Sequence, residues 1–182
     1  MIFTKTKLEG VYIITPRVFT DTRGYFFESY SQKEFKDNGL SYNFVQDNQS
    51  FSKYGTIRGL HFQKGEFAQA KLVRVIQGEV LDVAVDLRKD SPTYGQHVAV
   101  HLSDENQQQL LIPRGFAHGF SVLSDTAIFA YKCDNLYNKA SEGGLNPLDK
   151  NLNIDWKIPL SQANILDRDL SHPNLEELES CF

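Results

Sequence analysis

Between Lys71 and Cys133 the chain is a succession of short apolar segments separated by turn residues. Each segment has the length and the β-branched or aromatic content of a strand, and glycine, proline or asparagine stands at the breaks, as in Gln77-Gly78 and Ser91–Gly95. Short strands at such close spacing are typical of antiparallel sandwiches and barrels of the jelly-roll type. The pattern therefore predicts a mainly β protein with a few short helices.

The composition narrows the class of protein further. The chain has 182 residues, 41% hydrophobic and 23% charged, which fits one ordinary globular domain over residues 1–182. Thirteen Phe and eight Tyr favour strands over helices. The net charge is −4 without a basic stripe, so nucleic acid is not the expected partner, although a local basic pocket for a phosphorylated small molecule fits this charge.

Targeting and redox signals are few. No apolar run approaches the ~20 residues of a membrane span, and residues 1–10 lack the apolar core of a signal peptide, so we expect a cytoplasmic protein. Cys133 and Cys181 match no metal-binding spacing. In a reducing compartment they are expected to be free thiols.

Turn residues divide the chain into expected elements. We expect one helix over Gln32–Asn38, capped by Ser31 and closed by Gly39, a turn over Phe19–Gly24, a loop over Pro113–Gly119, and mostly loop beyond Asn138 with a helical end over 174–180. The predicted strands are Val11–Thr15, Tyr25–Tyr30, Phe44–Ser50 (turning polar along its length), Thr56–Gln63, Lys71–Ile76, Glu79–Leu87, Gln96–Leu102, Gln108–Ile112, Phe120–Leu123 and Ala127–Cys133.

The segment Arg58-Gly59-Leu60-His61-Phe62-Gln63 carries polar side chains on a strand. Alternation places Arg58, Leu60 and Phe62 on one face and Gly59, His61 and Gln63 on the other. Such a strand, followed by Lys71 on the next one, is suited to lining a polar cavity rather than a dry core.

The segment Pro113–His118 has the form P-x-G-x-x-H and resembles the second half-motif of the cupin superfamily, in which the histidine faces the barrel interior. The first cupin half-motif normally supplies His-x-His and a Glu for a metal ion, but here it is His61-Phe62-Gln63. Two histidines without a third ligand make a poor transition-metal site, so no metal is expected. A hydrogen-bonded loop histidine is the alternative interpretation of His118.

Longer segments resemble one family in particular, the dTDP-4-dehydrorhamnose 3,5-epimerases of the cupin superfamily. The resemblance implies a cupin-like jelly roll and an isomerase that works without a cofactor. The segments occur in the family's order and cover nearly the whole chain: 21–30, 45–48, 58–63, 71–74, 78–88, 112–120, 131–132 and 141–143.

The chemistry of such an enzyme can be argued from its substrate. A 4-keto sugar has acidic C–H bonds at C3 and C5, because the enolate spreads charge onto the C4 oxygen. Epimerisation requires a base on one face of the ring, an electrophile at the enolate oxygen and a proton donor on the other face. His61 is the candidate base, since imidazole titrates near ~6.5; Lys71 would hold the enolate oxygen, and the resemblance makes Tyr131 the proton donor.

The resemblance also places a carboxylate beside His61 and assigns the residues that bind substrate. Asp169 would orient the imidazole, with Asp167 as the alternative. Arg23 and Arg58 would contact the nucleotide and its phosphates, and Phe26 would stack on the base. The remaining expected contacts are Glu28, Gln46, Asp47 and Asn48 to thymine and deoxyribose, His118 to the sugar or a phosphate, and Glu142 and Arg168.

The resemblance further implies a homodimer in which the N-terminal strands pack on the partner. Arg23, Phe26 and Glu28 would then serve the neighbouring site. Each catalytic candidate also has a structural interpretation: Lys71 as a surface lysine, Tyr131 as a core aromatic and Asp169 as a cap. For Arg74, Asp82 and Asp86 we favour a buried ion network that supports the barrel.

The expected reaction is epimerisation of C3 and C5 of dTDP-4-dehydro-6-deoxy-D-glucose, giving dTDP-4-dehydro-L-rhamnose for dTDP-rhamnose biosynthesis. One alternative is a single-centre epimerase on a related nucleotide sugar. Two others, from different classes, are a metal-dependent cupin oxygenase or isomerase and a non-catalytic sugar-binding module.

Overall fold

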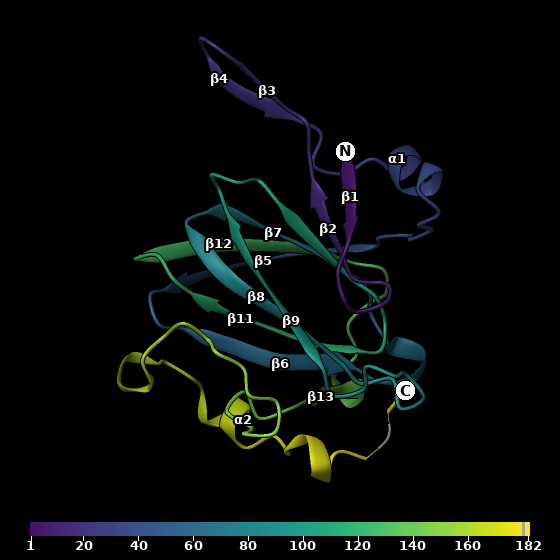
Figure 1. The fold of residues 1–182 in the computed structure, drawn as a ribbon, viewed down its shortest axis with the longest axis vertical. Helices are drawn as coiled ribbons and strands as arrows, with labels where there is room; N and C mark the ends of the chain where they lie inside the picture. The colour runs from purple at the N-terminus through teal and green to yellow at the C-terminus, as the bar shows by residue number, and fades with distance from the viewer. Residues whose placement is uncertain (180) are drawn as a thin grey trace.

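The computed structural model describes residues 1–179 and 181–182 and contains two antiparallel sheets that face each other (Figure 1). The six-stranded sheet has the order β1-β2-β10-β7-β12-β5. Its strands are β1 (Ile2–Lys5), β2 (Tyr12–Thr15), β5 (Gln46–Lys53), β7 (Lys71–Gln77), β10 (Gln109–Ile112) and β12 (Thr126–Cys133).

The second sheet has five strands in the order β13-β6-β11-β8-β9. They are β6 (Ile57–Gln63), β8 (Glu79–Asp86), β9 (His97–Ser103), β11 (Phe116–Val122) and β13 (Glu142–Gly144). All strand pairs within the two sheets are antiparallel. The predicted mainly β, cupin-like jelly-roll fold is confirmed.

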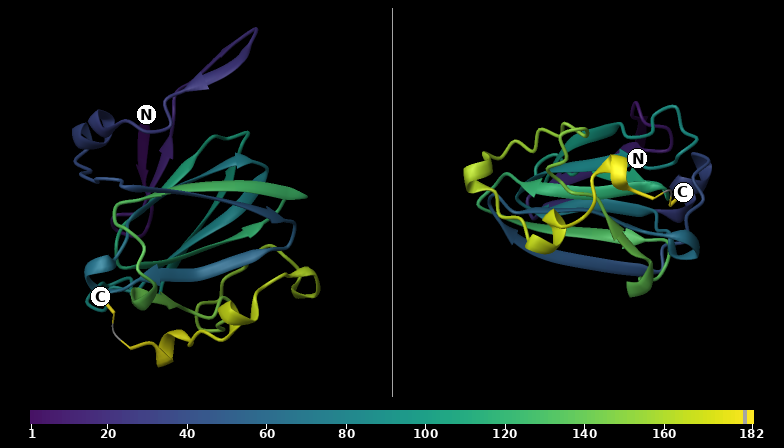
Figure 2. Two further views of the ribbon diagram at one scale, coloured as in Figure 1. Left: turned by 180° about the vertical axis from the view of Figure 1, so that it is seen from behind. Right: turned by 90° about the horizontal axis from the view of Figure 1, so that it is seen from below.

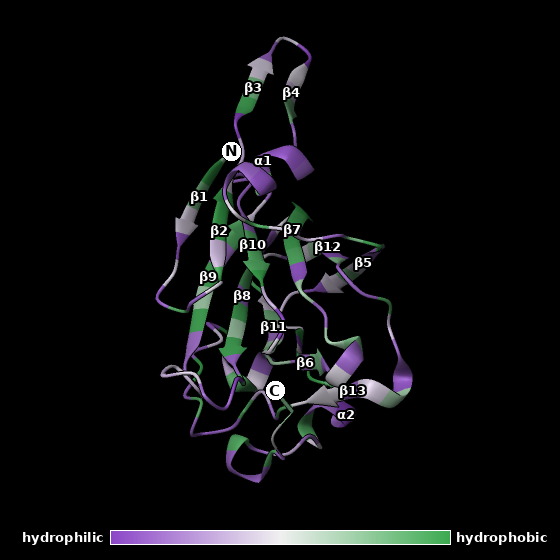
Figure 3. Ribbon diagram, turned by 90° about the vertical axis from the view of Figure 1, so that its right-hand side faces the viewer, coloured by the Kyte–Doolittle hydropathy of each residue, from purple (hydrophilic) through white to green (hydrophobic). Residues whose placement is uncertain are grey.

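Alternation along the strands produces the core between the sheets. Val73 and Val75 of β7, and Phe129 of β12, point inward and pack against Val80 and Phe120 of the opposite sheet. Colouring by hydropathy shows the apolar residues along β2, β8 and β9 (Figure 3). The apolar core fills only part of the space between the sheets, which leaves the remainder for a cavity.

Two segments cover the outer faces. Helix α1 (Gln32–Asp37) begins after Ser31, whose hydroxyl accepts from the Glu34 N–H, and its Phe35 packs on the six-stranded sheet. The C-terminal segment runs beneath β6 and covers the five-stranded sheet with Leu152 and Trp156 (Figure 2). This segment contains α2 (Asp167–Leu170). The short 3-10 helices are η1 (Gly65–Phe67), η2 (Lys139–Ser141), η3 (Leu160–Gln162) and η4 (Leu175–Glu177).

A hairpin of β3 (Val18–Asp21) and β4 (Gly24–Phe27) projects from the body of the molecule (Figure 1). The predicted turn over Phe19–Gly24 is wrong in extent, because the chain reverses within Thr22-Arg23 alone. The following predicted strand ends at Phe27 instead of Tyr30. None of the helices in the described residues is long and apolar enough to cross a membrane.

Three other expectations differ from the structure. Residues 116–119, predicted as loop, form half of β11, and alternation gave no signal there because β11 is buried along its whole length between β6 and β8. The strand predicted from Phe44 begins at Gln46 and consists of the polar residues, since one face lines a cavity and the other is exposed. Strands β1 and β13 were not expected. Ser180, at the end of the predicted helical segment, lies outside the described residues.

The predicted network of Arg74, Asp82 and Asp86 is also wrong. Asp82 bonds to His118, with 2.9 Å between Oδ2 and Nε2, while Arg74 lies over the ring of Phe27. Asp86 binds residues of its own loop: it accepts from Arg88 Nη2, Ser91 Oγ and Thr93 Oγ1, each at 2.7 Å. The short sequence separation between Asp86 and these donors decided its partners.

The Asp86 cluster yields a stability prediction. Burial opposes ionisation of Asp86, but the bonds from Arg88, Thr93 and Ser91 hold its pKa at about 2. We expect Asp86→Asn to lower the free energy of unfolding at pH 7 by about 2 kcal/mol, measured by urea denaturation. Because the folded-state pKa is depressed, this contribution is complete above the unfolded value of 3.8 and is lost as the pH falls toward 2.

Asp155→Asn is the matched control, because Asp155 forms an exposed ion pair with Lys157 and contributes little. The interpretation of Asp86 would be wrong if both variants lost the same stability, or if the loss in Asp86→Asn persisted undiminished at pH 2.

Candidate active site

A cavity of about 740 Å³ opens between the two sheets and is lined by both. From the six-stranded sheet come Gln46, Asn48, Lys71 and Tyr131, and from the other sheet and the C-terminal segment come Arg58, His61, His118, Glu142, Arg168 and Asp169. The fold thus brings ten of the predicted site residues into one cavity, although they are scattered from position 46 to position 169.

His61 and Asp169 form a hydrogen-bonded pair in the cavity. His61 Nε2 lies 2.9 Å from Asp169 Oδ1, and the Gly59 N–H donates to Asp169 Oδ2 at 3.3 Å. Asp167, the sequence alternative, is exposed, whereas Asp169 is buried on the side of α2 that packs against β6. Asp169 is therefore the carboxylate that contacts His61.

The charge state of Asp169 fixes the tautomer of His61. Burial opposes ionisation of Asp169, but the hydrogen bond from His61, the His61 charge, the Gly59 N–H and Arg168 together hold its pKa below the usual value. An ionised carboxylate only accepts hydrogen bonds, so His61 Nε2 donates. In the neutral imidazole, the free electron pair is then on Nδ1.

His118 stands beside His61, as its register partner on β11. It is buried, and its Nε2 contacts Asp82 Oδ2 at 2.9 Å. Burial lowers the pKa of His118; Asp82 opposes that shift, and the nearby Lys71 and His61 add to it. His118 belongs to a strand and not to a loop, and it presents a buried imidazole at the floor of the cavity.

Lys71 and Tyr131 face the cavity from the six-stranded sheet. Lys71 Nζ lies 5.8 Å from the centre of the Tyr131 ring. Burial lowers the pKa of Lys71, against the opposing charges of Cys133 and Asp82. Burial raises the pKa of the Tyr131 phenol, so the hydroxyl keeps its proton at neutral pH. Neither residue has the exposed surface position or the dry core position of its structural interpretation.

Arg58 lines the same cavity as His61, contrary to simple alternation. The pairing of β6 with β11 shifts register between His118 and Phe120, next to Gly59, and this irregularity turns Arg58 toward β5. There its Nε donates to Ser52 Oγ at 2.9 Å. A Cβ at Gly59, whose φ is +128°, would lie 2.6 Å from Gly119 Cα, so this close approach requires glycine.

Four predicted binding residues lie outside this cavity. Arg23, Phe26 and Glu28 belong to the projecting hairpin and the residue that follows it, and Arg23 pairs with Asp21. Asp47 is on the outer face of β5, where Lys132 Nζ contacts its Oδ1 at 2.9 Å. In one copy of the chain, the cavity therefore contains Gln46 and Asn48 but lacks Phe26, the residue expected to stack on the base.

Several polar residues of the site escaped the sequence analysis. Tyr137 donates to Glu142 Oε2 at 3.2 Å, and Ser52 holds Arg58. Gln63, by contrast, was expected on the same strand face as His61, and it accepts from the Asn138 N–H at 2.8 Å. His172 packs against His61, and its place three residues after Asp169 in a chain with only five histidines was the available signal.

The sequence and the fold were compared with those of known proteins. The family model described as dTDP-4-dehydrorhamnose 3,5-epimerase matches residues 5–177. A protein of that name from Salmonella typhimurium is 52% identical over 179 residues, which are 97% of each chain. The crystal structure of the Elizabethkingia anophelis dTDP-4-dehydrorhamnose 3,5-epimerase matches with a TM-score of 0.94 and 53% identity over 97% of each chain.

A third match carries a bound sugar nucleotide. It is the dTDP-6-deoxy-D-glucose-3,5-epimerase of Legionella pneumophila in complex with dTDP-4-keto-L-rhamnose, at 45% identity and a TM-score of 0.94, covering 98% of this chain and 94% of that one. Together with the cavity and its residues, these matches establish that the chain belongs to the dTDP-4-dehydrorhamnose 3,5-epimerase family.

Proposed function

We propose that this chain epimerises C3 and C5 of dTDP-4-dehydro-6-deoxy-D-glucose, with His61 as the base and Tyr131 as the acid. The observation that carries the proposal is their placement on opposite sheets: His61 is on β6 and Tyr131 on β12, and both line one cavity. A sugar ring held between them has the base on one face and the proton donor on the other, as inversion requires.

The proton transfers follow from the charge states of these groups. His61 Nδ1 takes the proton from C3 or C5, and the Asp169 carboxylate stabilises the resulting imidazolium through Nε2–H. The electrons of the broken C–H bond move to the C4 oxygen, where Lys71 Nζ donates a hydrogen bond. The Tyr131 hydroxyl then protonates the carbon from the other side, and the double bond returns to C4–O.

The partly buried Lys71 suits the enolate intermediate. Desolvation makes an isolated ammonium unfavourable, and a bound enolate oxygen supplies the missing negative charge. The interaction is strongest when charge has developed on that oxygen, so it stabilises the intermediate more than the bound ketone. Arg58 and Arg168, at the open part of the site, are suited to the diphosphate.

The alternatives are less well supported. A single-centre epimerase would need only one accessible carbon. The relatives at 52–53% identity are instead named 3,5-epimerases, which act on two carbons. A purely binding module would not need a partly buried phenol, a partly buried ammonium and a histidine–carboxylate pair around one cavity. We propose that residues 1–182 are one domain, because the C-terminal segment carries Asp169 into a site built by the sheets. We also propose a cytoplasmic location for the enzyme.

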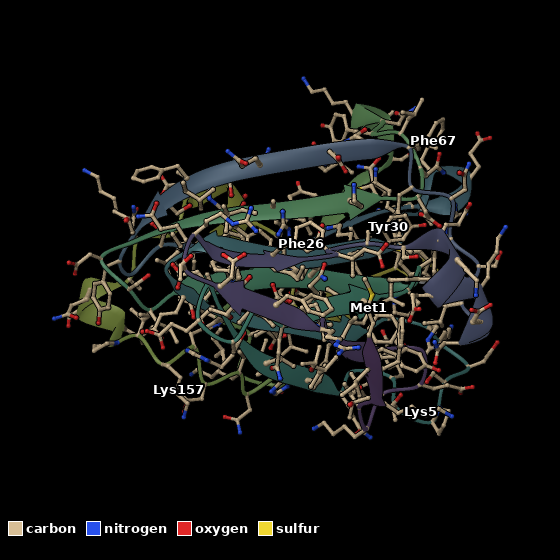
Figure 4. The ribbon with its side chains drawn as sticks, turned by 90° about the horizontal axis from the view of Figure 1, so that it is seen from above. Met1, Lys5, Phe26, Tyr30, Phe67 and Lys157 are labelled. Carbon is tan, nitrogen blue, oxygen red and sulfur yellow. The ribbon has the colours of Figure 1, made fainter. Side chains whose placement is uncertain are left out.

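We also propose a homodimer in which the β3–β4 hairpin reaches the neighbouring copy. The hairpin exposes Phe19 at 50%, Tyr25 at 60% and Phe26 at 71%, and Figure 4 shows the labelled Phe26 on it in a view from above. An isolated two-stranded hairpin is only marginally stable in water, so contact with another surface would stabilise this one. Such a partner contact would bring Arg23, Phe26 and Glu28 to a cavity that lacks them.

The roles of base and acid can be separated by deuterium exchange. In D₂O the wild type should incorporate deuterium at both C3 and C5 of dTDP-4-dehydro-6-deoxy-D-glucose, followed by mass spectrometry and NMR. His61→Ala should lower exchange by about 10³-fold, because no base remains. Tyr131→Phe should keep exchange but impair inversion, since the carbanion is formed and loses its opposite-face acid. Wild-type exchange in His61→Ala would remove His61 from the mechanism, and exchange at one carbon only would favour a single-centre epimerase.

Asp169→Asn tests how His61 is oriented. An amide can also donate to Nε2 and so permits the wrong tautomer, so we expect kcat to fall by about 10²-fold or more. Asp167→Asn, two residues away on the same helix and exposed, is the matched control and should keep the wild-type kcat. Equal activity of the two variants, with equal melting temperatures, would contradict the role of Asp169.

Phe26→Asp tests the dimer. A charge at this position should prevent the hairpin from packing on a partner, giving a monomer in sedimentation velocity and a raised KM. The control is Leu160→Asp, because Leu160 is as exposed, at 70%, but lies in the C-terminal segment. A Phe26→Asp protein that sediments as the wild type does would refute this interface.

A further inference from the structure

His172 lies next to the His61–Asp169 pair and has no part in the proposed reaction. Its ring packs edge-on against His61, with 5.8 Å between the ring centres and 77° between the planes. A Cβ at Gly144, the residue paired with His61 on β13, would overlap the His172 ring, so glycine provides the space for it. His172 Nε2 is buried and has no hydrogen-bond partner among the described residues.

An unpaired nitrogen in this position is unfavourable for the protein alone, because it has left water without gaining a partner. Its nearest polar neighbours are themselves ligand types. One ligand atom from each of His61, Asp169 and His172 lies within 4.8 Å of the other two. Within the described part of the chain, no other trio of His, Cys, Asp or Glu side chains meets this distance.

Two imidazoles and one carboxylate are a ligand set that Zn²⁺ binds, at about 2.0–2.2 Å with the fourth position left open. In a tetrahedral site the ligand atoms are about 3.4 Å apart, as follows from those bond lengths. For a metal ion to bind, the 2.9 Å between His61 Nε2 and Asp169 Oδ1 would have to widen slightly. The His172 ring would have to move closer to these two residues, whose ligand atoms lie within 4.8 Å of its own ligand nitrogen.

We propose that His61, Asp169 and His172 bind one Zn²⁺ ion, or a similar divalent transition-metal ion, and that this ion inhibits the enzyme. The site is distinct from the metal site of a cupin, whose second histidine is replaced here by Gln63. Binding would be driven by a nitrogen that lacks a partner and by a carboxylate already held against an imidazole. Arg168 Nε, 3.6 Å from Asp169 Oδ1, would weaken it by repulsion.

Inhibition follows from the single electron pair of a neutral imidazole. Without metal, Nε2 carries the proton and Nδ1 is free to act as the base. A metal bound at Nε2 takes the electron pair there, and the proton moves to Nδ1 without a net gain or loss of protons. His61 then has no free electron pair for the sugar, so kcat falls. This part of the inference rests on the proposed role of His61, whereas metal binding itself does not.

Calorimetry with zinc sulfate tests the binding. After removal of metals with a chelator, the wild type should bind one Zn²⁺ per chain, and His172→Ala should bind it at least tenfold more weakly. His172→Gln, which is closer to histidine in volume, is a second variant in case the alanine protein does not fold. His101→Ala is the control, since His101 is an exposed histidine paired with Glu79, and it should match the wild type. No stoichiometric zinc binding, or equal affinity of wild type and both His172 variants, would overturn the proposal.

Activity with and without zinc tests the inhibition. Zinc at saturating concentration should lower the wild-type kcat at least tenfold, and a chelator should restore it. His172→Ala should keep its own metal-free kcat when the same zinc concentration is added. Tight binding without loss of kcat would refute inhibition through His61, while deuterium exchange by metal-free His61→Ala tests the base separately.

Discussion

The hydrogen bond between His61 Nε2 and Asp169 Oδ1 joins residues that are 108 positions apart in the chain, and the site depends on it. It requires β6 to present an imidazole to the cavity and the C-terminal segment to bring a buried carboxylate to the same place. The carboxylate remains ionised because three groups, His61, Arg168 and the Gly59 N–H, favour its charge in spite of burial. As a result one nitrogen of His61 is a donor and the other is free to accept a proton.

The rest of the cavity is built from groups whose burial changes their chemistry. The phenol of Tyr131 is more firmly protonated and the ammonium of Lys71 less favourable than either would be in water. Both effects have one cause, the desolvation of side chains between two sheets. In the proposed reaction, the cavity wall that disfavours the isolated Lys71 ammonium would make it effective beside a developing enolate.

The C-terminal segment and the β3–β4 hairpin contribute to the site in different ways. The C-terminal segment packs Leu152 and Trp156 on the five-stranded sheet and so holds α2 in place. The β3–β4 hairpin instead projects with exposed aromatic side chains, so its contribution depends on another surface. His172 belongs to the C-terminal segment. Its position is set by Gly144 on one side and by the part of the segment that carries Asp169 on the other.

The sequence by itself determined the strand content and most strand positions, because these depend on local periodicity. Its long matching segments pointed to His61, Lys71 and Tyr131 as catalytic candidates. It could not place Arg58, since alternation fails where β6 shifts register beside Gly59. The resemblance preferred Asp169 but left Asp167 as an alternative, because only packing of α2 against β6 buries one and exposes the other. The sequence also missed the strand character of His118, as a segment buried on both faces has no alternation to detect. Tertiary structure decided these points, because each depends on which distant backbone lies alongside.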